Sequence, residues 1–250
     1  MIYITGDTHA DFTRFGRSYL TAAAGDYVIV CGDFGGVVWD ASKQSRYWLK
    51  WLSDKPFTTL FVDGNHENYD LLNSYPVTEW NGGKVHFITD HIIHLMRGQV
   101  FDIDDIRFFT MGGASSHDID AGILEPDDPD FRQKRKRLDR QTALYRVNHV
   151  SWWREELPSD EEMVEGLRNL NRCGYKVDVI LTHCAPNEIH DIYSRGGYRH
   201  DLLTDYLEMI KNKCDFKYWF FGHYHANEAI GRKFVLLYDK ILCLQEYMEM

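Results

Sequence analysis

The chain has 250 residues, of which 44% are hydrophobic and 26% are charged, and its formal net charge at pH 7 is -10. This length suits one large domain, and the composition is that of an ordinary globular protein with a sizeable core. The negative charge disfavours broad binding to a nucleic-acid backbone. No apolar run approaches the roughly 20 residues needed to span a bilayer, so we expect no membrane segment.

The two features that report on the cellular compartment agree with each other. The N-terminus enters a strand-like pattern at once, without the basic region and apolar core of a secretory signal. The five cysteines are odd in number, scattered, and never spaced C-x-x-C, which argues against a disulfide frame or a zinc ribbon. We therefore expect a cytoplasmic protein with reduced thiols.

Short apolar runs that end in Gly, Asp, Asn or His alternate with amphipathic segments. The runs are typical of buried strands, and the amphipathic segments predict helices. The predicted strands are residues 2–5, 27–31, 59–62, 85–88, 106–110, 177–181, 218–221 and 235–238. The predicted helices cover residues 42–52, 160–173 and 202–210; Ser159 and Glu162 form a capping box for the second, and Gly174 can end it. This alternation predicts an α/β fold, and we expect a single domain over residues 1–250.

The least regular region is residues 115–158, which we interpret as a cap-like insertion because long irregular segments within a domain tend to be functional. An acidic stretch at residues 125–130 precedes a basic cluster. This cluster is either a solvated helix face or a track for nucleic acid. Its members are Arg132, Lys134, Arg135, Lys136, Arg137 and Arg140.

Five short segments at the ends of predicted strands carry residue types that bind metals. They read G-D-T-H at 6–9, G-D at 32–33, G-N-H-E at 64–67, T-H at 182–183 and G-H-Y-H at 222–225. Open α/β sheets gather ligand sites at such strand ends. Side chains at i and i+2 of an extended segment point the same way, so Asp7 and His9 can share one ion. One such segment is weak support, but all five in this order indicate a metal centre.

This ordered set resembles the calcineurin-like metallophosphoesterase superfamily, whose motifs run D-x-H, G-D-x-x-[GD], G-N-H-[ED], H and G-H-x-H. The resemblance spans the chain from Asp7 to His225. It implies a four-layer α/β/β/α sandwich of two mixed sheets flanked by helices. It also implies two metal sites that share Asp33 as a bridge. The first consists of Asp7, His9, Asp33 and His225, and the second of Asp33, Asn65, His183 and His223.

The ligand set that the resemblance implies suits phosphate chemistry. Two divalent ions bring four positive charges, whereas Asp7 and Asp33 return only two negative ones, so an anion is attracted. Imidazole-rich ligation favours Mn, Fe, Zn or a similar metal. We therefore predict that a metal-bound hydroxide hydrolyses a phosphate ester, either a nucleotide or another small phosphomonoester or phosphodiester.

His66 follows Asn65 and is not a ligand in the family pattern. The resemblance makes it the group that stabilises or protonates the leaving oxygen, a task suited to imidazole near neutral pH. The alternative is a structural histidine at a turn. Protein Ser/Thr phosphatases of the superfamily read G-D-x-x-D-R-G in the second motif, and this chain has neither that Asp nor that Arg. Their absence counts against a phosphoprotein phosphatase and leaves the partner of His66 unassigned.

Two further segments resemble a bacterial and phage-associated branch with G-G-A-x-S-x-D and W-W-x-x-E-x-P-S signatures, at residues 112–118 and 152–159. His117 and Asp118 are candidates for substrate contact or for stabilising their loop. Trp152 and Trp153 are candidates for stacking on a base or for anchoring the next helix. Arg195 and Arg199 are candidate phosphate clamps, and Asn65 could also touch substrate.

Two alternative functions remain open at this stage. One is a nuclease acting on RNA or DNA, for which the basic cluster would be the binding track. The other is a non-catalytic, metal-stabilised scaffold that binds a protein. The sequence does not specify the substrate, the preference for monoester or diester, the metal used, or the oligomeric state.

Overall fold

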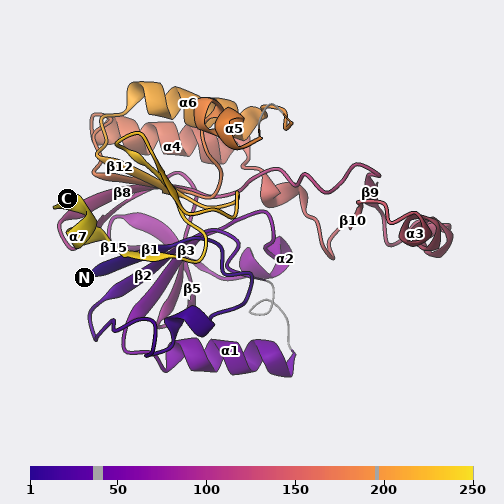
Figure 1. Cartoon of the computed structure of the whole chain (residues 1–250), viewed down its shortest axis with the longest axis horizontal. Helices are drawn as coiled ribbons and strands as arrows, with labels where there is room; N and C mark the ends of the chain where they lie inside the picture. Colours follow the sequence, from indigo (N-terminus) through magenta and orange to yellow (C-terminus); the bar gives the residue numbers. More distant parts are fainter. Residues whose placement is uncertain (36–41, 195–196, 250) are drawn as a thin grey trace.

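A computed structural model describes residues 1–35, 42–194 and 197–249. Within these residues the body is built on two mixed β-sheets that pack face to face (Figure 1). The first sheet has strand order β15-β1-β2-β3-β6-β5-β4, and the second has β13-β14-β12-β11-β8-β7. Strands β1, β2, β3 and β6 run parallel to one another, as do β8, β11, β12 and β14.

The strands of the first sheet are β1 (Ile2–Thr5), β2 (Tyr27–Cys31), β3 (Thr58–Val62), β4 (Val77–Trp80), β5 (Gly83–Thr89), β6 (Ile92–Leu95) and β15 (Ile241–Cys243). The strands of the second are β7 (Gln99–Ile103), β8 (Ile106–Met111), β11 (Val179–Thr182), β12 (Tyr218–Phe221), β13 (Glu228–Ile230) and β14 (Phe234–Leu236). All eight predicted strands are present. The last is displaced, because residues 237–238 lie beyond β14.

Helices cover the outer face of each sheet. Helix α1 (Lys43–Ser53) lies against the first sheet, and α4 (Asp160–Arg172), α5 (Asn187–Ser194) and α6 (Leu202–Lys213) lie against the second (Figure 1). One apolar core lies between the sheets and two more lie between sheet and helices. This is the predicted four-layer α/β/β/α sandwich. The described residues also form shorter helices: α2 (Tyr69–Leu72), α7 (Leu244–Met248), and the 3-10 turns Thr13–Phe15 and Arg154–Glu156.

The predicted start and end of α4 are confirmed. Ser159 Oγ accepts a hydrogen bond from the Glu162 amide at 3.2 Å, and Glu162 Oε2 accepts one from the Ser159 amide at 2.7 Å. Gly174 has φ +64°, and the amide of Tyr175 returns to the carbonyl of Leu170 at 2.8 Å. Glycine is favoured there because this left-handed conformation strains other residues.

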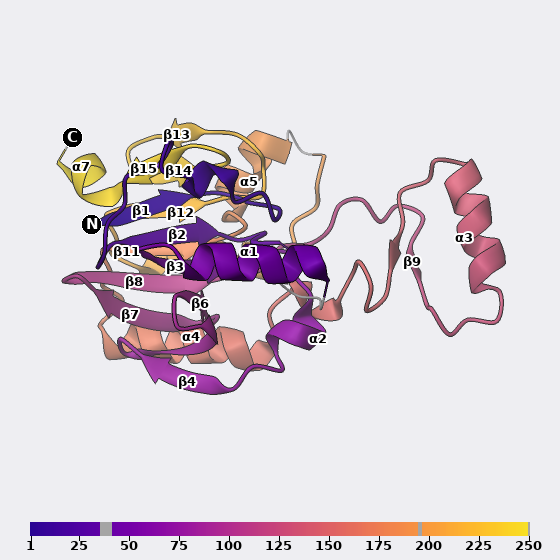
Figure 2. The ribbon, with the colours of Figure 1, turned by 90° about the horizontal axis from the view of Figure 1, so that it is seen from below.

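The segment at residues 115–158 extends away from the sandwich (Figure 2). It contains β9 (Ile123–Leu124) paired with β10 (Arg146–Val147), and α3 (Phe131–Arg140), which carries the basic cluster. Leu124, Leu138 and Val147 form a small apolar core of its own. Near its end Trp153 is buried among residues that include those of α2, and its Nε1 donates to Asp70 of α2 at 2.8 Å, so this tryptophan anchors the segment to α2 and not to the helix that follows. Among the described residues, no helix has both the length and the apolar character that crossing a membrane requires.

Candidate metal centre

The fold brings the five predicted ligand segments to one end of the sandwich. Three segments follow the adjacent parallel strands β1, β2 and β3, and two follow β11 and β12, which are parallel neighbours in the other sheet. Contacts between the sheets join the two sets. The backbone amide of His223 donates to Asp7 Oδ1 at 2.9 Å, and His183 Nδ1 donates to the carbonyl of Cys31 at 2.8 Å.

One group of ligand atoms comes from Asp7, His9 and His225. The Nε2 atoms of His9 and His225 lie 2.9 Å apart. Asp7 Oδ2 lies 3.1 Å from His225 Nε2 and 3.6 Å from His9 Nε2. Within the described residues, this buried Asp7 oxygen has no hydrogen bond of acceptable geometry. A buried carboxylate oxygen without a donor is costly, and a bound cation would satisfy it.

A second group comes from Asp7, Asp33 and His183, with Asn65 beside it. His183 Nε2 lies 3.4 Å from Asp33 Oδ1 and 3.2 Å from Asn65 Oδ1. Because His183 Nδ1 donates to a carbonyl, Nε2 is the nitrogen directed into this group, where a bound cation would take the place of its proton. The ring of His223 lies beside that of His183, with centroids 5.0 Å apart.

Asp33 lies between the two groups. Its Oδ1 faces His183, and its Oδ2 lies 3.8 Å from His9 Nε2. Burial alone would raise the pKa of Asp33, but the neighbouring histidines, His183 above all, hold it well below its usual range. Burial would likewise lower the pKa of His183, but Asp33 raises it overall. The buried carboxylate therefore attracts positive charge, and the donor set fits divalent cations.

A family model for calcineurin-like phosphoesterases matches residues 1–227, which include all five ligand segments. The chain belongs to this family. It is a metal-dependent phosphoesterase that uses divalent metal ions and acts on a phosphorylated substrate. A search of curated proteins gave no match.

Several candidate ligands of the phosphoesterase have an unusual backbone conformation. The φ angles of His9, Asp33, His223 and His225 are 43°, 44°, 72° and 49°. Non-glycine residues rarely adopt positive φ, and such conformations cluster at functional sites. The amide of His9 donates to the carbonyl of Asp33 at 2.8 Å, so the first two motif loops support each other.

The glycines of the motifs have more than one role. Gly32 has φ +89°, a left-handed conformation that glycine adopts without strain in the turn after β2. Gly64 and Gly222 have no such φ, and their role is close approach. A Cβ on Gly64 would lie 2.1 Å from Asp33 Oδ1, and one on Gly222 would lie 2.1 Å from Asp7 Oδ1. Any side chain there would displace a candidate ligand.

A cavity of about 410 Å³ opens beside the candidate ligands. His66 lines it, with its ring 5.5 Å from that of His9 and its amide donating to Asp33 Oδ1 at 2.9 Å. His117 also lines it, stacked on Tyr198 with ring centroids 3.7 Å apart. Arg199 is exposed and is not among the described residues that line the cavity, and Arg195 lies outside the described residues. The clamp role of both stays a prediction.

A hydrogen-bonded relay that the sequence analysis missed fixes the orientation of Asn65. Asn65 Nδ2 donates to Ser116 Oγ at 3.2 Å, and Ser116 Oγ donates to Glu156 Oε2 at 2.6 Å. With its nitrogen so engaged, Asn65 directs its oxygen toward His183. Ser116 is the serine of the G-G-A-x-S-x-D signature, and Glu156 is the glutamate of the W-W-x-x-E-x-P-S signature. These two signatures are therefore the sequence features that could have pointed to the relay.

Two other missed residues support the neighbouring loops. Glu67, the last residue of G-N-H-E, is buried and accepts hydrogen bonds from the amides of Phe34 at 2.8 Å and Gly35 at 3.4 Å. It therefore holds the backbone of the two residues that follow Asp33. Arg146, from β10 of the extended segment, lies with Nη2 3.5 Å from His66 Nε2. No sequence motif pointed to Arg146.

Proposed function

We propose that the phosphoesterase holds two divalent cations and hydrolyses a small phosphomonoester or phosphodiester, such as a nucleotide. In this proposal Asp7, His9, Asp33 and His225 hold one cation, and Asp33, Asn65, His183 and His223 hold the other. The proposal includes a single domain over residues 1–250, with residues 115–158 as a cap beside the cavity. Mn, Fe and Zn suit the imidazole-rich donor set.

The position of Asp33 is the observation that carries the proposal. Its two carboxylate oxygens face different histidines, His183 and His9, at 3.4 and 3.8 Å. A carboxylate in that position is suited to bridge two cations. Bound cations would supply Lewis acidity and positive charge, which activate water and attract the phosphate.

His66 is proposed to stabilise or protonate the leaving oxygen. It lines the cavity, its backbone amide donates to Asp33, and its ring lies 5.5 Å from that of the candidate ligand His9. The cavity volume, about 410 Å³, is within the range of small-molecule sites and suits a substrate of nucleotide size or smaller.

The test is a substrate screen with the Mn²⁺-loaded protein. The panel contains p-nitrophenyl phosphate, bis(p-nitrophenyl) phosphate, mononucleotides and short oligonucleotides. We expect turnover of at least one small ester and its loss in Asp33→Asn, while Asp102→Asn, an exposed aspartate of β7, keeps wild-type rates. Absence of turnover across the panel, or an active Asp33→Asn protein, would refute the proposal and favour a non-catalytic scaffold.

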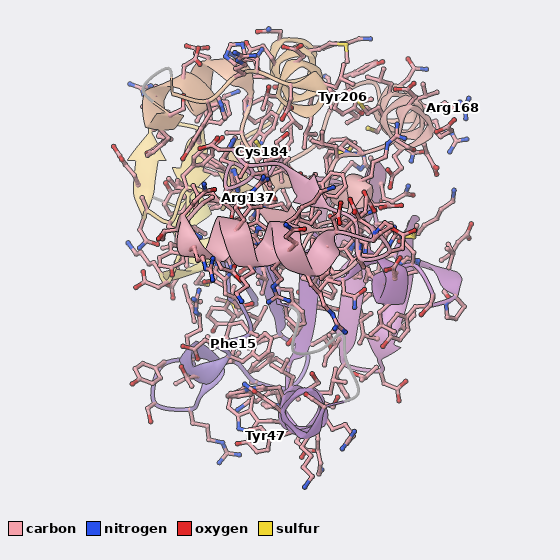
Figure 3. The ribbon with its side chains drawn as sticks, turned by 90° about the vertical axis from the view of Figure 1, so that its right-hand side faces the viewer. Phe15, Tyr47, Arg137, Arg168, Cys184 and Tyr206 are labelled. Carbon is pink, nitrogen blue, oxygen red and sulfur yellow. The ribbon has the colours of Figure 1, made fainter. Side chains whose placement is uncertain are left out.

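One observation favours a nuclease as the second candidate. Helix α3 carries six cations in ten residues, and most of their side chains are exposed. The segment that bears α3 follows β8, whose parallel neighbour β11 leads directly to His183. The segment therefore leaves the sheet at the end where the candidate metal centre lies. Figure 3 views the molecule from that side and shows α3 in the foreground.

Salt dependence separates the two candidates. If α3 binds a nucleic-acid backbone, hydrolysis of an oligonucleotide should fall steeply with salt, because each neutralised phosphate steepens the slope. Replacing Arg132, Arg137 and Arg140 together by Gln should flatten that slope and leave bis(p-nitrophenyl) phosphate turnover unchanged. A small-ester phosphatase would show no oligonucleotide cleavage with Mn²⁺.

A further inference from the structure

The extended segment brings a guanidinium into contact with His66 and Asp118, two residues that line the cavity. Arg146 belongs to β10, and its Nη2 lies 3.5 Å from Nε2 of His66, which is 80 residues away in sequence. Only 18% of the Arg146 side chain is exposed. Burying an arginine removes its charge from water, which is energetically costly unless the charge is paired.

Asp118 fixes the orientation of this guanidinium. Its Oδ1 accepts from Arg146 Nε at 2.9 Å, and its Oδ2 accepts from Nη2 at 2.5 Å, which is a bidentate pair. The carbonyl of Ser151 accepts from Nη1 at 3.3 Å. Bidentate pairing holds the planar guanidinium in one direction and offsets its charge.

The arginine retains donors for another acceptor. A guanidinium has five N–H groups, and the contacts to Asp118 and Ser151 use three of them. The second Nη2 hydrogen faces His66 across a gap too long for a good hydrogen bond. Among the described residues, the second hydrogen on Nη1 has no acceptor. An oxygen beside His66 could therefore accept from Arg146.

We propose that Arg146 and Asp118 form an anion subsite, in which Arg146 binds a phosphate oxygen of the substrate next to His66. The ligand class is a phosphate or phosphate ester, and the inference rests on the proposed function for the identity of the reaction. The cap supplies this guanidinium.

The experiment measures phosphate affinity and turnover separately. Inorganic phosphate binding to the Mn²⁺-loaded protein is followed by calorimetry, and hydrolysis of bis(p-nitrophenyl) phosphate gives kcat and KM. A charged hydrogen bond contributes enough for Arg146→Ala to weaken phosphate binding and lower kcat/KM by about 10- to 100-fold. Metal content should be unchanged. Arg168→Ala, on the exposed face of α4, is the matched control and should behave as wild type (Figure 3).

Rescue distinguishes a binding role from a structural one. Guanidinium chloride in the tens of millimolar should restore part of the activity of Arg146→Ala, because the small cation can occupy the vacated subsite. Asp118→Asn should lose activity without rescue, since its arginine is present but no longer fixed. If Arg146→Ala keeps phosphate affinity and kcat/KM within about twofold, or loses metal and is not rescued, the subsite is refuted.

The same measurements separate the two proposals. A protein that hydrolyses no ester but loses phosphate affinity in Arg146→Ala would refute the proposed function and support the subsite. A protein that hydrolyses esters equally well with and without Arg146 would support the proposed function and refute the subsite.

Discussion

Arg97 donates hydrogen bonds from Nε and Nη2 to the same carboxylate oxygen of Asp63, at 2.8 and 2.5 Å. The other oxygen of Asp63 lies 3.1 Å from His94 Nε2. The Arg97 and Asp63 side chains are only 4% and 1% exposed. Burial would raise the pKa of Asp63, but Arg97 and His94 hold it well below its usual range. Asp63 directly precedes the G-N-H-E segment that contains Asn65 and His66.

Breaking this pair should destabilise the fold and the loop together. Arg97→Met removes the guanidinium from a buried ion pair, and loss of one partner of such a pair typically costs about 3–5 kcal/mol of unfolding free energy. We expect that loss in urea denaturation, with weaker binding of Mn²⁺. Arg107→Met is the control, because Arg107 pairs with Asp102 at the surface, where an ion pair contributes about 0–1 kcal/mol. Equal losses in the two variants would contradict a special role for the buried pair.

The candidate ligands could be found from sequence because each follows its own strand directly. Asp7, Asp33 and Asn65 lie within three residues of the ends of β1, β2 and β3, so predicting the strands was enough to place them near one another. Parallel pairing then brings these ends together. The capping box at Ser159 could also be predicted from the sequence, because its two partners are three residues apart.

The partners of these residues could not be found in the same way. Ser116 reaches Glu156 over 40 residues and Arg146 reaches His66 over 80, through a segment without regular periodicity. Their contacts depend on where that segment folds back, which no local pattern encodes. Arg97 looked like any charged residue between two strands. Its burial depends on Asp63 in the neighbouring motif, a pairing that only the tertiary fold creates.

The relay from Glu156 through Ser116 to Asn65 predicts a metal-binding defect. Ser116→Ala removes the acceptor for Asn65 Nδ2, so the amide can rotate and its oxygen no longer faces the cluster steadily. Loss of such a supporting hydrogen bond typically lowers metal affinity about 10- to 100-fold. Titration with Mn²⁺ measures it. Ser115→Ala is the neighbouring control, because Ser115 bonds to Asp201 instead. Similar affinities in the two variants would contradict the relay.

The buried pair of His86 and His94 predicts a loss of stability in acid. Their Nδ1 atoms lie 3.2 Å apart, and burial, helped by His94, lowers the pKa of His86 to about 4. The folded protein therefore binds fewer protons at His86 than the unfolded chain does, so stability is complete above about pH 6.5 and falls toward pH 4. The lowered pKa of His86 corresponds to a loss of about 1–3 kcal/mol of unfolding free energy as the pH falls through this range.

Urea denaturation at pH 7.0, 5.5 and 4.5 tests this dependence. Other histidines also titrate in this range, so the informative quantity is the difference between wild type and His86→Leu. Because His86→Leu removes the titrating group, its unfolding free energy should fall less between pH 7.0 and pH 4.5 than that of the wild type. Parallel curves for the two proteins would show that His86 is not the source. His91→Leu, at an exposed turn, should retain the wild-type slope.

The role assigned to His66 predicts a loss that depends on the leaving group. His66→Ala removes no candidate ligand, so metal content should be unchanged, while turnover falls by about 10²- to 10⁴-fold. A group that protonates the leaving oxygen matters most when that oxygen is a poor leaving group. The loss should therefore be larger for phenyl phosphate than for p-nitrophenyl phosphate, in steady-state assays with Mn²⁺. A structural histidine would lower both rates equally and would reduce thermal stability, and that pattern would remove His66 from the chemical step.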